Sequence, residues 1–225
     1  MAKKIKQKHQ AQKRETNWLL IGGVVAIGVI ALFGLLFLSL REPEQATLAT
    51  YCADNPGRCI TQGNKNARVT VVEVSDFGCV HCRNFHAETK PLIDQQFIDT
   101  NQLYWVVLPY ALSSTTLPAS NAAMCANEQG AFFEYSEALF AQQTEAVALT
   151  RAGFEQAAQA LGLEMDAFAQ CLSEGRYNTI INNNMNAARS VRVSATPSFF
   201  VNDRLLEGAQ PFTVFQQRIS SLLNN

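Results

Sequence analysis

Cys79 and Cys82 are separated by two residues, at a point where a strand is predicted to turn into a helix. The preceding run, 69–74, is β-branched and mostly apolar, which is typical of a buried central strand. The residues after Cys82 are polar and compatible with a helix. Cys79 is therefore expected at a helix N-terminus, where free N–H groups and the helix dipole favour a thiolate. A low-pKa thiolate beside a second thiol is suited to dithiol–disulfide exchange.

Two other chemistries compete with redox exchange at these cysteines. Together with the first two cysteines of the chain, Cys79 and Cys82 could form a four-thiolate zinc site, although the six-residue gap in the first pair is unusual for one. A Cys–His hydrolase is disfavoured, because the only histidine close to the pair, His81, lies inside it. The spacing of the histidines indicates no metal cluster, so we predict neither a metal nor a cofactor.

A long apolar segment precedes the redox motif. Residues 18–40 are 23 consecutive positions without a charged side chain. As a helix they would span about 34 Å, enough to cross a bilayer. The alternative is a cleaved signal peptide, but its apolar region would be only about 7–15 residues long and would end at a small-residue cleavage site. The sequence therefore predicts one N-terminal transmembrane helix, an uncleaved anchor.

The charges on either side of this segment indicate its orientation. Residues 1–17 carry six Lys or Arg and one Glu, a net charge of +5, so the rest of the chain carries −6 of the total of −1. The positive-inside tendency makes 1–17 a cytoplasmic basic tail and places 41–225 in a periplasmic or extracellular space. All six cysteines lie in that exported part, which fits an oxidising compartment. It has no basic stripe and no nucleic-acid motif, so nucleic-acid binding is excluded.

The exported part shows a clear order of elements. Residues 41–66 are polar and read as a linker in which Cys52 and Cys59 bracket a turn-rich loop. The strand at 69–74 is followed by a helix from Cys79 or Val80 to about Ile98, interrupted or kinked at Pro91, and by a strand at 103–108. Ala-rich helices are predicted at 118–129, 131–142, 150–161, 166–173 and 177–189. A hairpin of strands at 198–201 and 204–207 and a helix at 212–223 complete the chain.

The dipeptide Thr196-Pro197 opens the third strand, a position where the missing N–H of proline is tolerated. With the Cys-x-x-Cys upstream and the hairpin downstream, the sequence resembles the thioredoxin superfamily, in which a cis-proline loop lies against the redox disulfide. The helical block before the cis-proline strand makes it similar to the DsbA-like thiol:disulfide oxidoreductases. The matching motifs are residues 71–82, 122–135, 196–202 and 208–209, and the resemblance covers about residues 60–223.

The resemblance implies an α/β thioredoxin fold with an inserted α-helical domain, preceded by the transmembrane helix at 18–40. The thioredoxin-like domain would comprise residues 67–116 and 192–225, and the inserted helical domain residues 117–191.

It also implies roles for the site residues. Cys79 would be the attacking thiol and Cys82 the resolving thiol. His81 would stabilise the Cys79 thiolate, whereas Val80 departs from the proline of DsbA and leaves the redox potential open. Another interpretation of His81 is a solvent-facing helix residue.

The family's buried acid corresponds to Glu73, which would accept or return the proton of Cys82. Burial should raise the pKa of Glu73 toward neutrality; the alternative is an edge-strand glutamate that faces water. Thr196 and Pro197 would offer main-chain groups to a bound substrate peptide.

The other four cysteines are candidates for structural disulfides. Some relatives carry a bridge like Cys125–Cys171, which would close a loop of about 46 residues; buried free thiols are the alternative. Cys52 and Cys59 could form a local clip or a second redox pair near the membrane.

The function implied is a membrane-tethered oxidase that introduces disulfides into reduced exported proteins. Its reoxidation implies a quinone-linked membrane partner of the DsbB or vitamin K epoxide reductase type. The alternatives are a disulfide reductase or isomerase, and a tethered, non-catalytic chaperone-like binding module.

Overall fold

The computed structural model describes residue 23, residues 27–32 and residues 47–224, and the chain divides into two units, 1–45 and 46–225. In the first unit, residues 23 and 27–32 are helical and exposed. Within the described residues, no helix combines the length and the apolar character needed to cross a membrane. The tail predicted at 1–17 lies outside the described residues, as does most of the span predicted at 18–40.

A five-stranded mixed sheet in the order β1-β3-β2-β4-β5 forms the centre of the second unit. Its strands are β1 (Ile60–Gly63), β2 (Val69–Ser75), β3 (Leu103–Pro109), β4 (Ser198–Val201) and β5 (Arg204–Glu207). β2 and β3 are parallel, with Val69 opposite Leu103, and the other pairs are antiparallel. The carboxyl ends of β2 and β3 therefore meet at one edge, where the chain turns into the Cys-x-x-Cys segment.

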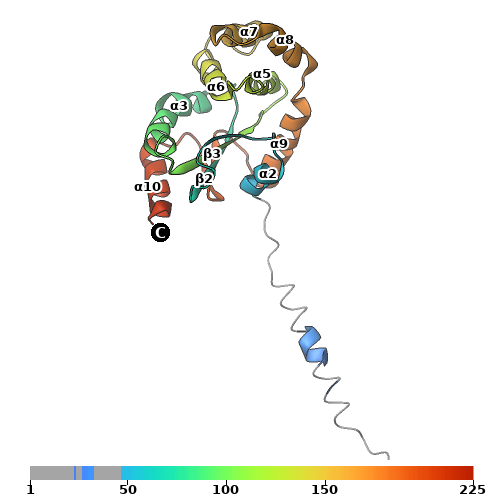
Figure 1. Ribbon diagram of the computed structural model, residues 1–225, viewed down its shortest axis with the longest axis vertical. Coiled ribbons are helices and arrows are strands. Elements are labelled where there is room, and N and C mark those ends of the chain that lie inside the picture. The colour runs from blue at the N-terminus through green and yellow to red at the C-terminus, as the bar shows by residue number, and fades with distance from the viewer. Residues whose placement is uncertain (1–22, 24–26, 33–46, 225) are drawn as a thin grey trace, which may run out of the picture. The chain divides into compact units, whose positions relative to one another are not determined.

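Helices cover both faces of the sheet and one end of it (Figure 1). α3 (Val80–Glu88), α4 (Lys90–Ile93) and α10 (Phe212–Leu223) lie on one face, around a core that includes Phe85, Phe199 and Phe215. α2 (Leu48–Asp54) and α9 (Asn178–Ser190) pack on the other face. Between β3 and β4 the chain also forms α5 (Leu117–Asn127), α6 (Phe132–Ala141), α7 (Arg151–Ala160) and α8 (Met165–Glu174), which group at the end of the sheet.

The linker predicted at 41–66 is wrong for residues 47–66. α2 and β1 lie in this segment, and β1 pairs with β3 from Ile60 opposite Val107 to Gly63 opposite Tyr104. α2 begins at a Thr47 capping box and buries Leu48. Both elements are too short to show a hydrophobic period, and tertiary packing holds them in place.

The helical segment predicted from Cys79 or Val80 to Ile98 is interrupted next to Pro91, as expected. It is divided into α3, α4 and a π-helical turn, η1 (Asp94–Ile98). The break falls at Thr89, two residues before Pro91, because the proline lacks an N–H and its ring would clash with the carbonyl four residues earlier.

Candidate active site

The two thiols of the Cys-x-x-Cys segment differ in accessibility. Cys79 is the N-cap residue of α3, with extended backbone, and its side chain is half-buried. Cys82, one turn further along the helix, has no exposed surface. Both are free thiols. An incoming sulfur can therefore reach Cys79, whereas Cys82 is reached only through Cys79.

The surroundings of the pair push the two pKa values in opposite directions. The pKa of Cys79 is lowered to about 5, chiefly by a hydrogen bond from the Cys82 thiol. Partial burial opposes this shift, whereas Thr196 and the backbone N–H groups of Cys82 and His81 add to it. Burial is the main cause that raises the pKa of Cys82 far above its ordinary value, and the hydrogen bond with the Cys79 sulfur raises it further. Cys79 is thus a thiolate at neutral pH, and Cys82 keeps its proton.

The loop before β4 faces the Cys79 sulfur. The peptide bond between Thr196 and Pro197 is cis. The Thr196 carbonyl oxygen lies 3.3 Å from the Cys79 sulfur and accepts a hydrogen bond from it when Cys79 is protonated. The Thr196 hydroxyl is buried and has no hydrogen bond of normal geometry to any described residue. It nevertheless lies close enough to both sulfurs to lower the pKa of each.

Asp76 organises the turn between β2 and α3. Its buried carboxylate accepts hydrogen bonds from the Gly78 N–H (2.7 Å), the Leu112 N–H (2.7 Å) and the Thr116 hydroxyl. Its own N–H donates to the Cys82 sulfur over 3.5 Å. Asp76 was not predicted as a site residue, although an aspartate two residues before a glycine, directly after a strand, is a usual turn signal.

Glu73 is fully buried in β2, but its surroundings differ from the prediction. Its carboxylate accepts hydrogen bonds from Ser75 and Trp105 Nε1 (3.0 Å) and lies 2.6 Å from His86 Nε2. Burial alone would raise the pKa of Glu73; the charge and hydrogen bond of His86, with Ser75 and Lys90, outweigh it and lower the pKa to about 2. The predicted rise toward neutrality is therefore wrong.

The Glu73 carboxylate lines a partly open cavity of about 50 Å³ between the sheet, α3 and α6. Lys90 and Asp94 form an ion pair on this cavity, and the Lys90 ammonium lies over the Trp105 ring, 5.1 Å from its centroid. The contacts of Glu73 with His86 and Lys90 were not predicted from the sequence. Both residues come from helical segments at least 13 positions after Glu73.

Comparison with known proteins agrees with this arrangement. The family model described as Thioredoxin matches residues 55–221, which include both thiols and the cis-proline loop. The chain belongs to the thioredoxin family.

Relatives of this thioredoxin-family chain differ in overall length. An Na⁺/H⁺ antiporter NhaA 3 of Salinispora tropica is 35% identical over 68% of this chain and 23% of its own. A Rickettsia typhi protein provisionally named a protein-disulfide oxidoreductase is 29% identical over 72% of this chain and 60% of its own. The disulfide bond formation protein D of Bacillus subtilis is 22% identical over 72% of this chain and 75% of its own. The chain thus spans less than two thirds of the first two relatives.

Solved structures with the same fold include a DsbA protein and BdbD. The crystal structure of Wolbachia pipientis α-DsbA1 matches with a TM-score of 0.68, at 22% identity over 76% of this chain and 93% of its own. Oxidised BdbD from Bacillus subtilis matches with a TM-score of 0.67, at 20% identity over 73% of this chain and 92% of its own. These likenesses show that the thioredoxin fold of this chain, with helices between β3 and β4, is the one these proteins adopt.

The two residues between the cysteines are both exposed. Val80 is 47% exposed, and the His81 side chain points to solvent in the first turn of α3. The contribution of His81 that the structure records comes from its backbone N–H, which favours the Cys79 thiolate.

Two disulfides lie outside the redox pair. Cys52 is bonded to Cys59 between α2 and β1, and Cys125 to Cys171 between α5 and α8. Because Cys52 and Cys59 are bonded to each other, they are not free to join Cys79 and Cys82 in a four-thiolate site.

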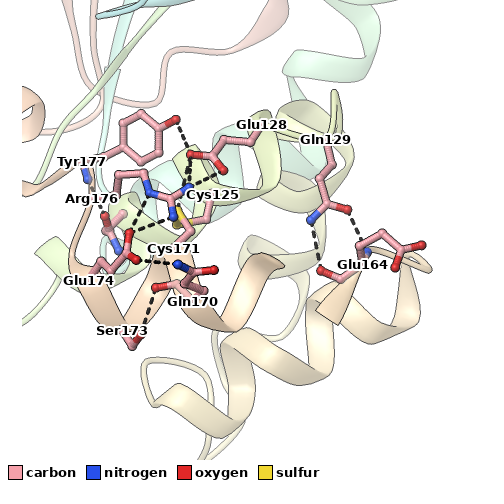
Figure 2. Close-up of polar contacts among 11 residues, drawn as sticks. Cys125, Glu128, Gln129, Glu164, Gln170, Cys171, Ser173, Glu174, Arg176 and Tyr177 are labelled. Atoms are coloured by element: carbon pink, nitrogen blue, oxygen red, sulfur yellow. Dashed lines mark hydrogen bonds and ion pairs between the residues drawn. A yellow bond between two sulfur atoms is a disulfide. The ribbon is translucent and has the colours of Figure 1, made fainter. Parts of the chain in front are cut away.

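An ion-pair cluster surrounds the Cys125–Cys171 disulfide. Figure 2 shows Arg176 between the carboxylates of Glu128 and Glu174, with nitrogen–oxygen distances of 2.7 Å to each, and the Tyr177 hydroxyl donating to Glu128. The cluster connects the end of α5 to the segment between α8 and α9, so it reinforces the same contact as the disulfide.

Proposed function

We propose that this chain is a DsbA-type protein-disulfide oxidoreductase that works as an oxidase. The observation that carries the proposal is the contrast between the two thiols: Cys79 is accessible, with a pKa lowered to about 5, and Cys82 is buried with a raised pKa. A stabilised thiolate lowers the free energy of the reduced form and so makes the disulfide more oxidising. The names of the Rickettsia and Bacillus relatives support the same class.

The reaction begins with the pair as a disulfide. A substrate thiolate attacks the Cys79 sulfur, the Cys79–Cys82 bond breaks, and Cys82 leaves and takes up a proton, as its raised pKa favours. A second substrate thiolate then attacks the substrate sulfur of the mixed disulfide, and Cys79 leaves as a thiolate. The substrate loses two electrons and gains a disulfide, while the enzyme pair gains those two electrons.

Anchoring and partners are further parts of the proposal. The uncharged run at 18–40 and the net charge of +5 in residues 1–17 support a single-pass anchor with the catalytic domain outside the cytoplasm. Its substrates would be reduced exported proteins. The pair would be reoxidised by a quinone-linked membrane protein of the DsbB or vitamin K epoxide reductase type, a partner inferred from the family resemblance.

The test combines a titration with an exchange assay on the full chain. Thiolate absorbance of the reduced protein should titrate with a midpoint near pH 5, and a Cys79→Ser variant should lack this step. The oxidised protein should form disulfides in a reduced, unfolded substrate protein. In Cys82→Ala, the Cys79 thiolate should attack a disulfide of an oxidised substrate protein, release the second substrate sulfur as a thiolate and accumulate as a mixed disulfide. A midpoint near pH 8.5, the ordinary range of a free thiol, together with a strongly reducing equilibrium against glutathione would favour the reductase or isomerase.

The same experiment separates the enzyme from the binding module. A tethered chaperone-like protein needs no dithiol, so Cys79→Ser would leave its activity intact. The proposed oxidase should lose disulfide formation completely in that variant.

A further inference from the structure

The turn that carries Cys79 is held by a side chain of the helical insert. Gln143 follows α6, and its Nε2 donates to the carbonyl oxygens of Phe77 (2.6 Å) and Cys79 (3.1 Å). Because both partners are acceptors, only the NH₂ end of the amide can meet them, which fixes the orientation of the side chain. One glutamine thus bridges the two ends of a three-residue turn.

A second attachment joins the same turn to the segment that immediately precedes the insert. The Asp76 carboxylate connects the Gly78 N–H to Leu112 and to the Thr116 hydroxyl. A Cβ added at Gly78 would lie 2.6 Å from Thr116 Cγ2, which is closer than real Cβ contacts. The turn and the segment before α5 are therefore in direct contact, with no room for a side chain between them.

Aromatic packing brings α6 against both sides of the turn. The ring of Phe77 lies 4.9 Å from that of Phe140, measured between centroids, and Phe140 stacks on His86 of α3 at 4.2 Å. Gln143 lies one helical turn after Phe140 in sequence. Its two hydrogen bonds therefore start from a segment that is already fixed against the redox helix.

The position of the Cys79 sulfur depends on this turn. The Cys79 N–H donates to the Asp76 carbonyl over 3.0 Å, and the Cys79 carbonyl accepts from the Arg83 N–H over 3.1 Å. Rotation of the Phe77–Cys79 peptides would carry the sulfur away from the N–H groups at the start of α3 and from Thr196. The two carbonyls held by Gln143 belong to the peptides that would have to rotate.

We propose that Gln143 is a positioning residue for disulfide exchange: it fixes the Phe77–Cys79 turn so that the Cys79 sulfur faces both the α3 N–H groups and the Thr196 loop. This inference rests on the proposed function. It gives the helical insert a part in the redox chemistry, because the glutamine acts from the insert through the backbone of the turn.

The test compares two neighbouring glutamines in the full chain. Gln143→Met keeps the side-chain length and removes the donor. Gln142→Met is the matched control, because Gln142 donates instead to the Gly153 carbonyl, over 3.1 Å and from a buried position. The readouts are the Cys79 pKa from thiolate absorbance and the equilibrium of the dithiol pair with glutathione.

In Gln143→Met we expect the Cys79 pKa to rise by about half a unit to one unit, and the equilibrium to shift toward the disulfide by about threefold to tenfold. The control should change neither value, although it loses a buried hydrogen bond. An unchanged pKa and equilibrium in a folded Gln143→Met would overturn the proposal. Equal shifts of the pKa and of the equilibrium in Gln143→Met and Gln142→Met would also overturn it, because they would indicate a general loss of packing.

A second substitution at the same position keeps the inference testable if Gln143→Met fails to fold. Gln143→Glu has the same shape, but its carboxylate would face two carbonyl oxygens and repel the Cys79 thiolate, so the pKa rise should exceed that of Gln143→Met. Unchanged readouts in this variant would also reject the inference. The pKa is measured without substrate, so a wild-type protein that fails to exchange disulfides would count against the proposed function and not against the role of Gln143.

Discussion

His86 Nε2 lies 2.6 Å from Oε1 of Glu73, a carboxylate without exposed surface in the central strand of the sheet. The contact joins α3, the helix that carries both redox thiols, to β2. It also reverses the effect that burial alone would have, because it keeps Glu73 ionised in the interior. The redox helix is therefore attached to the sheet by the His86–Glu73 hydrogen bond as well as by aromatic packing.

Replacing His86 by Phe should destabilise the protein strongly. The substitution keeps a ring against Phe140 but leaves the Glu73 charge buried without its main partner, and breaking a buried pair costs about 3–5 kcal/mol. Urea unfolding at pH 7 measures the loss. The double variant Glu73→Gln/His86→Phe is the control and should recover part of it, and a single variant as stable as wild type would show that the pair contributes little.

Glu73 should also produce an acid-dependent loss of stability. Its folded pKa of about 2 lies below the ordinary value of 4.5, so its contribution is complete above pH 4.5 and is lost as the pH falls toward 2. The expected loss is about 3 kcal/mol. Unfolding free energies measured between pH 6 and the acid limit, in wild type and in Glu73→Gln, should diverge in this window. Parallel curves would contradict the lowered pKa.

Thr196→Val should separate redox tuning from stability. The substitution keeps the shape and removes a buried hydroxyl that has no hydrogen bond of normal geometry to any described residue, so the free energy of unfolding should stay the same or increase. The Cys79 pKa should rise, since the hydroxyl favours the thiolate. Thiolate titration and urea unfolding of the same variant check both statements. A destabilised protein with an unchanged pKa would show that the hydroxyl is structural.

The two structural disulfides should stabilise the protein by different amounts, and neither should be needed for disulfide exchange. On the chain-entropy estimate, a double Cys→Ala replacement of Cys125 and Cys171, 46 residues apart, should cost about 4 kcal/mol, and that of Cys52 and Cys59, seven residues apart, about 2.5 kcal/mol. Both variants should keep the low Cys79 pKa and exchange disulfides. Loss of exchange in the folded Cys52/Cys59 variant would instead indicate a second redox pair.

Local patterns predicted the elements that carry the thiols. The apolar β-branched run became β2, and the turn residues Asn202 and Asp203 form the tight turn of the β4–β5 hairpin, both with positive φ. These features depend on neighbours within a few residues, so they can be read from the sequence. The thioredoxin fold followed from their order along the chain.

The remaining features depend on contacts between distant segments. α2 and β1 are held by packing and pairing, not by their own periodicity. The Glu73 pKa was predicted with the wrong sign because burial is visible in a Val-rich strand, whereas the facing His86 is not. Gln143 lies 64 residues from the Cys79 carbonyl it holds, and no spacing rule connects them.

Trp105 gives the protein an internal optical probe. Its indole N–H bonds to the Glu73 carboxylate, its ring lies parallel to Phe85 of α3, and the Lys90 ammonium lies over it. The chain has one other tryptophan, Trp18. With Trp18 replaced, all indole emission would come from a single residue in contact with both the buried charges and the redox helix. Protonation beneath the dithiol could then be followed by fluorescence in real time, without any attached dye.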